Sequence, residues 1–192
     1  NMALANIFVL GISARLIFLP YPVGNDVFRY VWEGCIQNLG FNPFNYSPLS
    51  PALAEIAQGD LSAIWQQINH AEFSAAYPPV ALLIFRFFAW LNPDPFFFKT
   101  AMIGFDIGVM ILLLLMIKQR GVLPSRLLLY AANPLILLYI SGEGHLDIIQ
   151  VFFLCLALYL ILCKKSPATG FSMLGLALLS KYLALAALPF LV

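Results

Sequence analysis

The sequence predicts an all-α integral membrane protein, in which a bundle of transmembrane helices carries a long segment outside the membrane. Hydrophobic residues make up 62% of the chain and charged residues only 10%, whereas soluble domains carry about 25% charged residues. Several apolar stretches approach the roughly 20 residues that a helix needs to cross a bilayer. Most charged and turn-forming residues lie between these stretches, so apolar runs alternate with polar loops.

Five stretches are predicted to span the membrane. Each is strongly apolar, and the few charges inside them are isolated. Arg15 in the first stretch has a long stem that can carry its charge to an interface, and Asp106 lies inside the second. The predicted spans are residues 1–20, 96–117, 127–141, 146–163 and 170–192.

Basic loops set the expected orientation of these spans. Two short loops hold basic residues and no acid: Lys118, Arg120 and Arg126 in one, Lys164 and Lys165 in the other. The positive-inside rule places both loops in the cytoplasm. The loop that contains residues 142–147 and the long segment 21–95 are therefore expected on the extracytoplasmic side.

The beginning of the outer segment 21–95 predicts an amphipathic helix at the membrane interface. Asp26 stands where an N-cap belongs, and Gly40 suits the position just after a helix end. Apolar residues between them recur with helical spacing, which places Tyr30 and Trp32 in the headgroup layer. These apolar positions are Val27, Phe28, Val31, Trp32, Cys35, Ile36 and Leu39.

The rest of the outer segment predicts shorter helices. Residues 42–48 are rich in turn formers, and short helices are expected from Ser50 and over residues 61–68. The apolar run 80–91 has about a dozen residues, a length more typical of re-entrant, interfacial or buried helices than of spans. We expect a re-entrant helix there. A crossing helix is the alternative, and it would either put the two polar sites of the chain on opposite faces or turn one basic loop outward.

Two polar sites stand out against this apolar background. Residues 142–147, Gly-Glu-Gly-His-Leu-Asp, place two carboxylates and an imidazole between apolar runs, and Asp26 and Arg29 open the outer segment. Moving an ionised carboxylate into hydrocarbon costs roughly 2.5–3.5 kcal/mol on insertion scales. Such groups therefore usually line a water-filled cavity or bind a ligand. Lys181, about halfway along the last predicted span, needs a partner for the same reason.

Each of these residues also has a purely structural alternative. Asp26 could act only as a helix cap, and Arg29 could pair with Glu33 four residues later. Lys181 could be buried without a ligand. Three others could be structural: His70 as a surface loop residue, Asp106 as a packing partner of a neighbouring helix, and His145 as a hydrogen bonder at a helix start.

The order of the short motifs resembles a known superfamily. The motifs are Asp-Val-Phe-Arg-Tyr-Val-Trp-Glu-Gly (26–34), Asn-Pro-Phe-Asn-Tyr-Ser-Pro (42–48), Ile-Asn-His (68–70), Tyr-Pro-Pro (77–79), Asn133-Pro134, Gly-His-Leu-Asp (144–147) and Ser-Lys-Tyr (180–182). Together they resemble the GT-C superfamily of membrane glycosyltransferases. The series is most similar to the bacterial polyprenyl-phosphate-mannose-dependent mannosyltransferases, relatives of the first mannosyltransferase of GPI-anchor synthesis.

The resemblance implies a GT-C-type transmembrane helix bundle whose long extracytoplasmic first loop carries amphipathic and re-entrant helices. It implies transfer of a hexose, expected to be mannose, from a polyprenyl-phosphate donor to a glycan or glycolipid acceptor. The site would face outward from a bacterial plasma membrane. Asp26 and Asp147 become candidate catalytic carboxylates. A carboxylate that accepts the acceptor's hydroxyl proton typically contributes about 10²–10⁴-fold to the rate.

The resemblance also implies a set of substrate-binding residues. Arg29 and Lys181 would meet the departing lipid phosphate, because preorganised cations in a dry site stabilise such a charge. The other candidates are Tyr30, Glu33, Tyr46, Asn69, His70, Tyr77, Glu143 and His145. Family members often carry a second Asp near the position of Asp26, but here Asn25 precedes it, so an Asp-x-Asp metal site is doubtful and no cofactor is expected. Glu33 and Glu143 also depart from the residues usual at their positions, Asp and Asn.

Two other function classes stay open. A transporter could use Asp106, Asp147 and Lys181 as an intramembrane relay, and a non-catalytic membrane subunit would need no site. A net charge of +1 gives no reason to expect a nucleic-acid partner. The chain begins with Asn1 and ends inside an apolar run, as expected for an N-terminal fragment. The three cysteines have no metal-ligand spacing and are expected to be inert.

Overall fold

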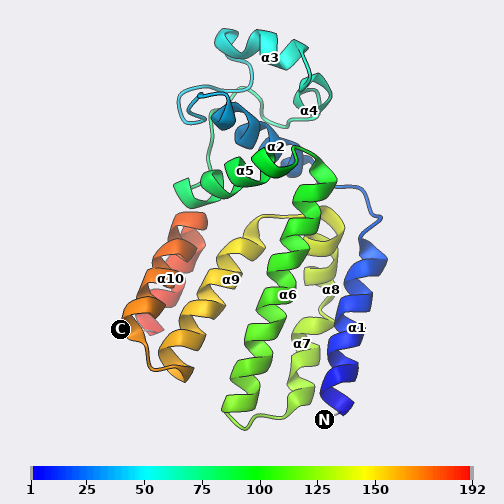
Figure 1. The fold of residues 1–192 in the computed structure, drawn as a ribbon, viewed down its shortest axis with the longest axis vertical. Coiled ribbons are helices and arrows are strands. Elements are labelled where there is room, and N and C mark those ends of the chain that lie inside the picture. The colour runs from blue at the N-terminus through cyan, green and yellow to red at the C-terminus, as the bar shows by residue number, and fades with distance from the viewer. Residues whose placement is uncertain (1, 191–192) are drawn as a thin grey trace.

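Helix α6 (Pro95–Gln119) is the longest element of the computed structural model, which describes residues 2–190 (Figure 1). The carboxylate Oδ1 of Asp94 accepts a hydrogen bond of 2.8 Å from the Phe97 N–H, and Pro95 occupies the first helical position. Within the described chain, α6 is the one helix long and apolar enough to cross a membrane. The other apolar helices have 10–17 residues.

Several shorter helices lie alongside α6 and form a helical bundle (Figure 1). No β-strand occurs within residues 2–190. The elements of the bundle are α1 (Met2–Phe18), η2 (Pro124–Leu127), α7 (Leu128–Ala131), α8 (Pro134–Ile136), the π-helical η3 (Leu137–Glu143), α9 (Asp147–Leu158) with its π-helical continuation η4 (Tyr159–Cys163), α10 (Pro167–Ser180) and η5 (Tyr182–Phe190).

Two of the predicted spans are broken helices. The stretch 127–141 is interrupted at Asn133-Pro134, because proline disfavours helical backbone geometry in the residue before it. The Asn133 side chain then caps the next helix by accepting a hydrogen bond from the Leu135 N–H. The stretch 170–192 is interrupted at Lys181, whose backbone is extended (φ −161°, ψ 131°). Lys181 therefore stands at a helix end and not in the middle of a continuous span.

A second layer covers one end of the bundle. Helices α2 (Asn25–Asn38) and α5 (Pro79–Leu91) lie across this end, and α5 runs over it instead of crossing alongside α6 (Figure 1). A Cβ on Gly34 of α2 would lie 2.3 Å from the backbone oxygen of Phe85, so glycine allows the two helices to touch. The short elements η1 (Pro51–Leu53), α3 (Ala54–Gln58) and α4 (Ser62–Trp65) complete this layer.

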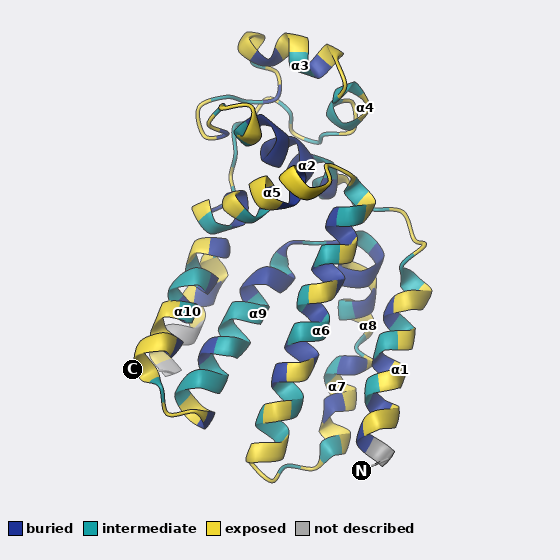
Figure 2. Ribbon diagram, in the orientation of Figure 1, coloured by how far each residue is buried: buried dark blue, intermediate teal, exposed yellow. Residues whose placement is uncertain are grey.

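Helix α2 is largely buried inside the protein. The prediction that Tyr30 and Trp32 sit in the headgroup layer is wrong, because these side chains are 1% and 0% exposed. Most of the helix is buried (Figure 2), since α5 covers one side and Leu53 and Ala57 pack against Trp32 on another. The helix begins at Asn25 with Gly24 as its N-cap, so Asp26 lies in the first turn and is not the cap.

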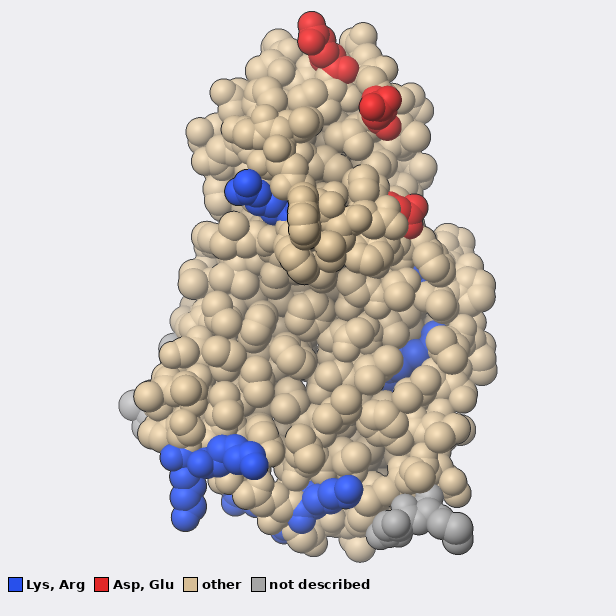
Figure 3. Space-filling view, viewed as in Figure 1, with Lys and Arg blue, Asp and Glu red and all other residues tan. Residues whose placement is uncertain are grey.

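Charge separates the two ends of the molecule. Lys and Arg gather at the end where α6 finishes, and Asp and Glu lie at the opposite end, over the layer formed by α2 to α5 (Figure 3). The basic loops that follow α6 and α9 hold exposed Lys118, Arg120, Arg126, Lys164 and Lys165. The asymmetry is the one expected if these loops face the cytoplasm.

Arg15 is buried in the bundle and does not extend to an interface as expected. Its guanidinium binds both carboxylate oxygens of Asp106, at 2.6 and 3.1 Å, and the backbone oxygens of Gly11 and Ala131. The Tyr130 hydroxyl donates to the same carboxylate at 2.6 Å. Asp106 is thus a packing partner of a neighbouring helix, the structural alternative open from the sequence.

Candidate active site

Two adjoining cavities lie where α2, the η3–α9 turn and the end of α10 meet. The first has a volume of about 350 Å³ and the second about 420 Å³, and they share Asp26 and His145. The first is lined by Asp26, Tyr30, Tyr77, Tyr139, Ile140, His145, Leu146, Asp147 and Lys181. The second is lined by Tyr21, Pro22, Val23, Gly24, Asn25, Asp26, Glu143 and His145.

The two polar sites predicted from the sequence are joined by main-chain contacts. The Gly24 N–H donates to the backbone oxygen of Glu143 at 2.8 Å, just before α2 begins. Gly144 has φ +85°, a conformation that favours glycine, and a Cβ there would lie only 3.2 Å from the Cα of Lys99. This turn directs His145 toward Asp26.

Asp26 has one carboxylate oxygen held and the other near an imidazole. Its Oδ1 accepts a 2.9 Å hydrogen bond from Asn69 Nδ2, and its Oδ2 lies 3.7 Å from His145 Nδ1. The other ring nitrogen of His145 lies 2.8 Å from Glu143 Oε2. The Asp26 side chain is 34% exposed, so it can reach a bound molecule as well as its protein partners.

Lys181 and Asp147 form an ion pair on the wall of the 350 Å³ cavity. Lys181 Nζ lies 2.5 Å from Asp147 Oδ1. Both side chains remain partly exposed, at 39% and 45%. The partner of Lys181 is therefore a carboxylate of the cavity, and the pair presents both charges to the space next to Asp26.

Two tyrosine hydroxyls complete the polar lining of this cavity. The Tyr30 and Tyr77 rings pack edge to face with centroids 5.3 Å apart. Burial raises the pKa of both hydroxyls above the ordinary value, and the neighbouring Asp26 carboxylate adds to the effect. Both tyrosines therefore stay protonated near neutral pH and can donate hydrogen bonds.

Arg29 does not line either cavity, although a residue that binds the leaving phosphate was expected to do so. Its Nε binds Glu33 Oε1 at 2.9 Å, the i,i+4 pairing open from the sequence. Its remaining nitrogens bind backbone oxygens of His70 at 2.8 Å, Phe73 at 2.6 Å and Ser74 at 2.9 Å. Arg29 thus fastens this loop to α2, and the same loop supplies the Asn69 amide that holds Asp26.

Besides Asn69, which reaches the site only through Asp26, three other predicted residues lie outside the cavities. Glu33 is buried beside Arg29, and its Oε2 has no hydrogen-bond partner in the described residues. Tyr46 packs edge to face on Phe41, in the apolar cluster around Trp32. The His70 side chain is exposed, as a surface loop residue would be.

Sequence reasoning missed two residues that shape the site. Tyr139 lines the cavity, with its ring 5.2 Å from the His145 ring, but it sits in an apolar run without any motif. Lys99 donates to the backbone oxygens of Leu19 and Tyr21 at 2.9 and 2.6 Å, and so holds the chain that leads to α2. An isolated lysine inside a predicted span was the signal that could have identified Lys99.

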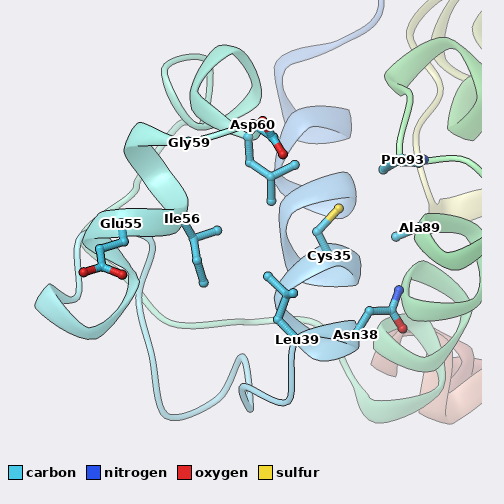
Figure 4. A pocket seen from close by; sticks show the side chains of 10 residues that line it. Cys35, Asn38, Leu39, Glu55, Ile56, Gly59, Asp60, Ala89 and Pro93 are labelled. Atoms are coloured by element: carbon cyan, nitrogen blue, oxygen red, sulfur yellow. The ribbon is translucent and has the colours of Figure 1, made fainter.

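A more apolar recess of about 500 Å³ lies near the other end of α2, between α2, α3 and α5 (Figure 4). Leu39 and Ile56 point into it, whereas the Glu55 carboxylate points away. It contains none of the predicted site residues. The charged cavities around Asp26 are therefore the candidate active site. Within residues 2–190 no group of three or more His, Cys, Asp or Glu side chains is placed to hold one metal ion.

Comparison with known proteins identifies the family. Residues 13–192 match the family described as alpha-(1->6)-mannopyranosyltransferase, N-terminal domain. The chain belongs to this family. The match confirms the mannosyltransferase resemblance seen in the motifs and supports a role in mannosyl transfer. No curated protein and no solved structure matches the chain.

We expect the stability of this mannosyltransferase domain to depend on pH because the Glu33 carboxyl is buried. Burial raises the pKa of Glu33 from 4.5 to about 7, against the opposing effect of Arg29. The folded state therefore binds more protons than the unfolded state between these values, and its stability falls as the pH rises toward 7. We expect Glu33→Gln to reduce this fall, measured as the melting temperature in detergent at an acidic and a mildly alkaline pH.

Glu55→Gln is the matched control, because Glu55 is an exposed carboxylate of the same layer. It should leave the difference between the two melting temperatures as in the wild type. If the melting temperatures of Glu33→Gln at the two pH values differed as much as those of the wild type, the Glu33 carboxyl would not be the source of the pH dependence.

Proposed function

We propose that this domain carries the catalytic site of a GT-C-type mannosyltransferase. The reaction transfers mannose from a polyprenyl-phosphate donor to a hydroxyl of a glycan or glycolipid acceptor at the extracytoplasmic face of a bacterial plasma membrane. The observation that carries the proposal is the convergence of Asp26, Asp147 and Lys181 on one cavity of about 350 Å³. These residues come from three distant segments that the motif order also singled out.

Asp26 is the proposed base. Its Oδ1 is held by Asn69 at 2.9 Å, which leaves Oδ2 as the oxygen available to a ligand. As the acceptor oxygen bonds to the anomeric carbon, its proton passes to Asp26 and the bond from that carbon to the phosphate oxygen breaks. The transition state resembles an oxocarbenium ion, so the carboxylate of Asp147 also stabilises the developing positive charge.

Lys181 is the proposed partner of the leaving lipid phosphate. Its ammonium pairs with one carboxylate and remains partly exposed to the cavity, so a second anion can approach it. An added phosphate would share the ammonium with Asp147. The Tyr77 hydroxyl, on the cavity wall, remains protonated and donates a hydrogen bond to the sugar or the phosphate. The bond changes require only a base and a cation, so we write the reaction without a cofactor.

The transporter alternative receives no support from the arrangement of charges. A relay would need Asp106 to communicate with Asp147 and Lys181. Asp106 instead bonds with Arg15 and Tyr130, and it does not line either cavity of the site. The buried Arg15–Asp106 pair holds helices together, whereas the partly exposed Lys181–Asp147 pair faces the cavity.

The orientation of the site predicts a labelling pattern in a background that lacks the three native cysteines. Ala52→Cys lies exposed in the layer over the site, and Ser125→Cys lies exposed near the basic end. A membrane-impermeant thiol reagent added outside intact cells should label the first and not the second. Labelling of Ser125→Cys with protection of Ala52→Cys would place the site in the cytoplasm and contradict the proposal.

Asp26→Asn tests the base. The amide keeps the size of the side chain but cannot accept the proton, so we expect the transfer rate of the complete membrane-embedded enzyme to fall about 10²-fold or more. Transfer from a polyprenyl-phosphate mannose donor is the measurement. Asp60→Asn is the control, because Asp60 is exposed and lines neither cavity of the site. A rate within a few-fold of wild type for Asp26→Asn would exclude the base role.

Lys181 and Asp147 are tested together, because the two charges are paired. A hydrogen bond to a charged group contributes about 1.5–3 kcal/mol, so Lys181→Met should weaken donor binding about 10- to 100-fold. Lys181→Arg should retain part of the affinity, since the charge remains. The double variant Lys181→Met/Asp147→Asn should show the same donor defect as Lys181→Met. Restoration of donor binding in the double variant would make Lys181 only the ion-pair partner of Asp147.

A further inference from the structure

Helix α5 has two unlike faces. One face packs against α2, α10 and the Phe98 ring of α6 through buried apolar residues: Ala81, Leu82, Phe85, Phe88 and Ala89. The opposite face is exposed although it is rich in large apolar side chains: Leu83, Phe87, Trp90 and Leu91. Trp90 is 71% exposed, an unusual position for a tryptophan in contact with water alone. We call this exposed set the α5 surface.

Arg86 lies in the middle of the α5 surface. Its Nε donates to Asn38 Oδ1 at 3.3 Å, and the Asn38 amide donates back to the Arg86 backbone oxygen at 3.1 Å. Within residues 2–190, no carboxylate lies within salt-bridge distance of Arg86, and neither terminal nitrogen makes a hydrogen bond. Arg86 thus presents an anchored but uncompensated charge beside a shallow recess of about 260 Å³, lined by Asn38, Leu83, Arg86, Phe87 and Trp90.

The connection to α6 fixes how far the α5 surface can lie from a membrane. Only residues 92–94 separate the end of α5 from the start of α6, the helix that satisfies the membrane criterion. Four residue steps span about 14 Å at most. If α6 crosses the bilayer, α5 therefore lies within the headgroup layer or next to it. Tryptophan and arginine are the side chains that favour this layer, because they combine an apolar body with a polar end.

We propose that the α5 surface is a lipid-binding site, in which Arg86 binds the phosphate of an anionic bilayer phospholipid. Leu83, Phe87 and Trp90 would contact the upper acyl chains. Charge complementarity supports this occupant, because Arg86 is exposed and no carboxylate within residues 2–190 lies within salt-bridge distance of it. The inference rests on the membrane placement of α6 in the proposed function, and it does not depend on the catalytic roles of Asp26 or Lys181.

The α5 surface is distinct from the proposed donor site. Its recess shares no lining residue with the two cavities around Asp26. A phospholipid phosphate and the donor's lipid phosphate have the same chemistry, so the experiment has to separate them. Bound phospholipid would stay in place through the reaction, whereas bound donor would be consumed by it.

The test uses the complete protein in nanodiscs of phosphatidylcholine that contain increasing fractions of phosphatidylglycerol, brominated near the headgroup. Bromine quenches tryptophan at short range, and Trp90→Phe identifies the share of emission that belongs to Trp90. We expect Trp90 to be quenched at low fractions of brominated phosphatidylglycerol. Since a basic residue near an anionic surface contributes about 1 kcal/mol, Arg86→Gln should raise the half-saturating fraction about fivefold. Arg86→Lys should stay near the wild-type value.

Arg126→Gln is the matched control, because it removes an exposed arginine at the opposite end. It should leave Trp90 quenching unchanged, and Arg86→Gln should leave the KM for the polyprenyl-phosphate donor within twofold of wild type. Trp90 accessible to iodide but not to brominated lipid would overturn the lipid site. An Arg86→Gln effect confined to the donor KM would also overturn it and assign Arg86 to the donor.

Failure of the membrane placement gives a different result. The protein would then not be retained by nanodiscs, and brominated lipid would quench no tryptophan in any variant. That result would overturn both the lipid site and the membrane part of the proposed function. A retained, active protein whose Trp90 is quenched equally by brominated phosphatidylcholine and phosphatidylglycerol would overturn only the anionic phosphate site.

Discussion

The geometry of the site depends on the buried ammonium of Lys99, which connects the segments that carry the site residues. It lies near the start of α6 and donates to the backbone oxygens of Phe18, Leu19 and Tyr21, where α1 has just ended. The last carbonyls of a helix have no partner within it, and a cation is favoured at that end. The turn at Gly144 packs against the backbone of the same lysine. One residue therefore contacts both the chain that leads into α2 and the turn that carries the second polar site.

Two ion pairs of this protein differ in burial and in the number of their partners. Arg15 and Asp106 are fully buried and bind each other, two carbonyls and a tyrosine. Removing one member of such a pair leaves an uncompensated buried charge and typically costs about 3–5 kcal/mol. The charges of the cavity are partly exposed and make few bonds with the protein. The cavity charges can therefore form further hydrogen bonds with a ligand, whereas the Arg15–Asp106 pair cannot.

The sequence predicted which segments would meet but not how each charge would be used. Helical periodicity located α2, and the rule that buried charges need partners pointed to Asp26, Asp147 and Lys181. The partners of Arg29 could not be predicted, because they are mostly main-chain oxygens of a loop, which leave no signal in residue types. The burial of Tyr30 and Trp32 was missed for a related reason. An amphipathic helix shows that one face is apolar, but the sequence does not tell whether lipid or protein covers it.

The functional charges also occupy helix ends, where the backbone itself stabilises them. Asp26 is the second residue of α2 and Asp147 the first of α9, so both carboxylates lie at helix N-termini. Lys181 directly follows α10, so its ammonium lies at a helix C-terminus. A carboxylate at a helix N-terminus and an ammonium at a helix C-terminus interact favourably with the helix dipole, typically by about 0.3–1 kcal/mol. The cavity can therefore hold two carboxylates and an ammonium without complete neutralisation by neighbouring side chains. These few bonds leave Asp26 Oδ2 and the remaining protons of Lys181 Nζ open toward the cavity.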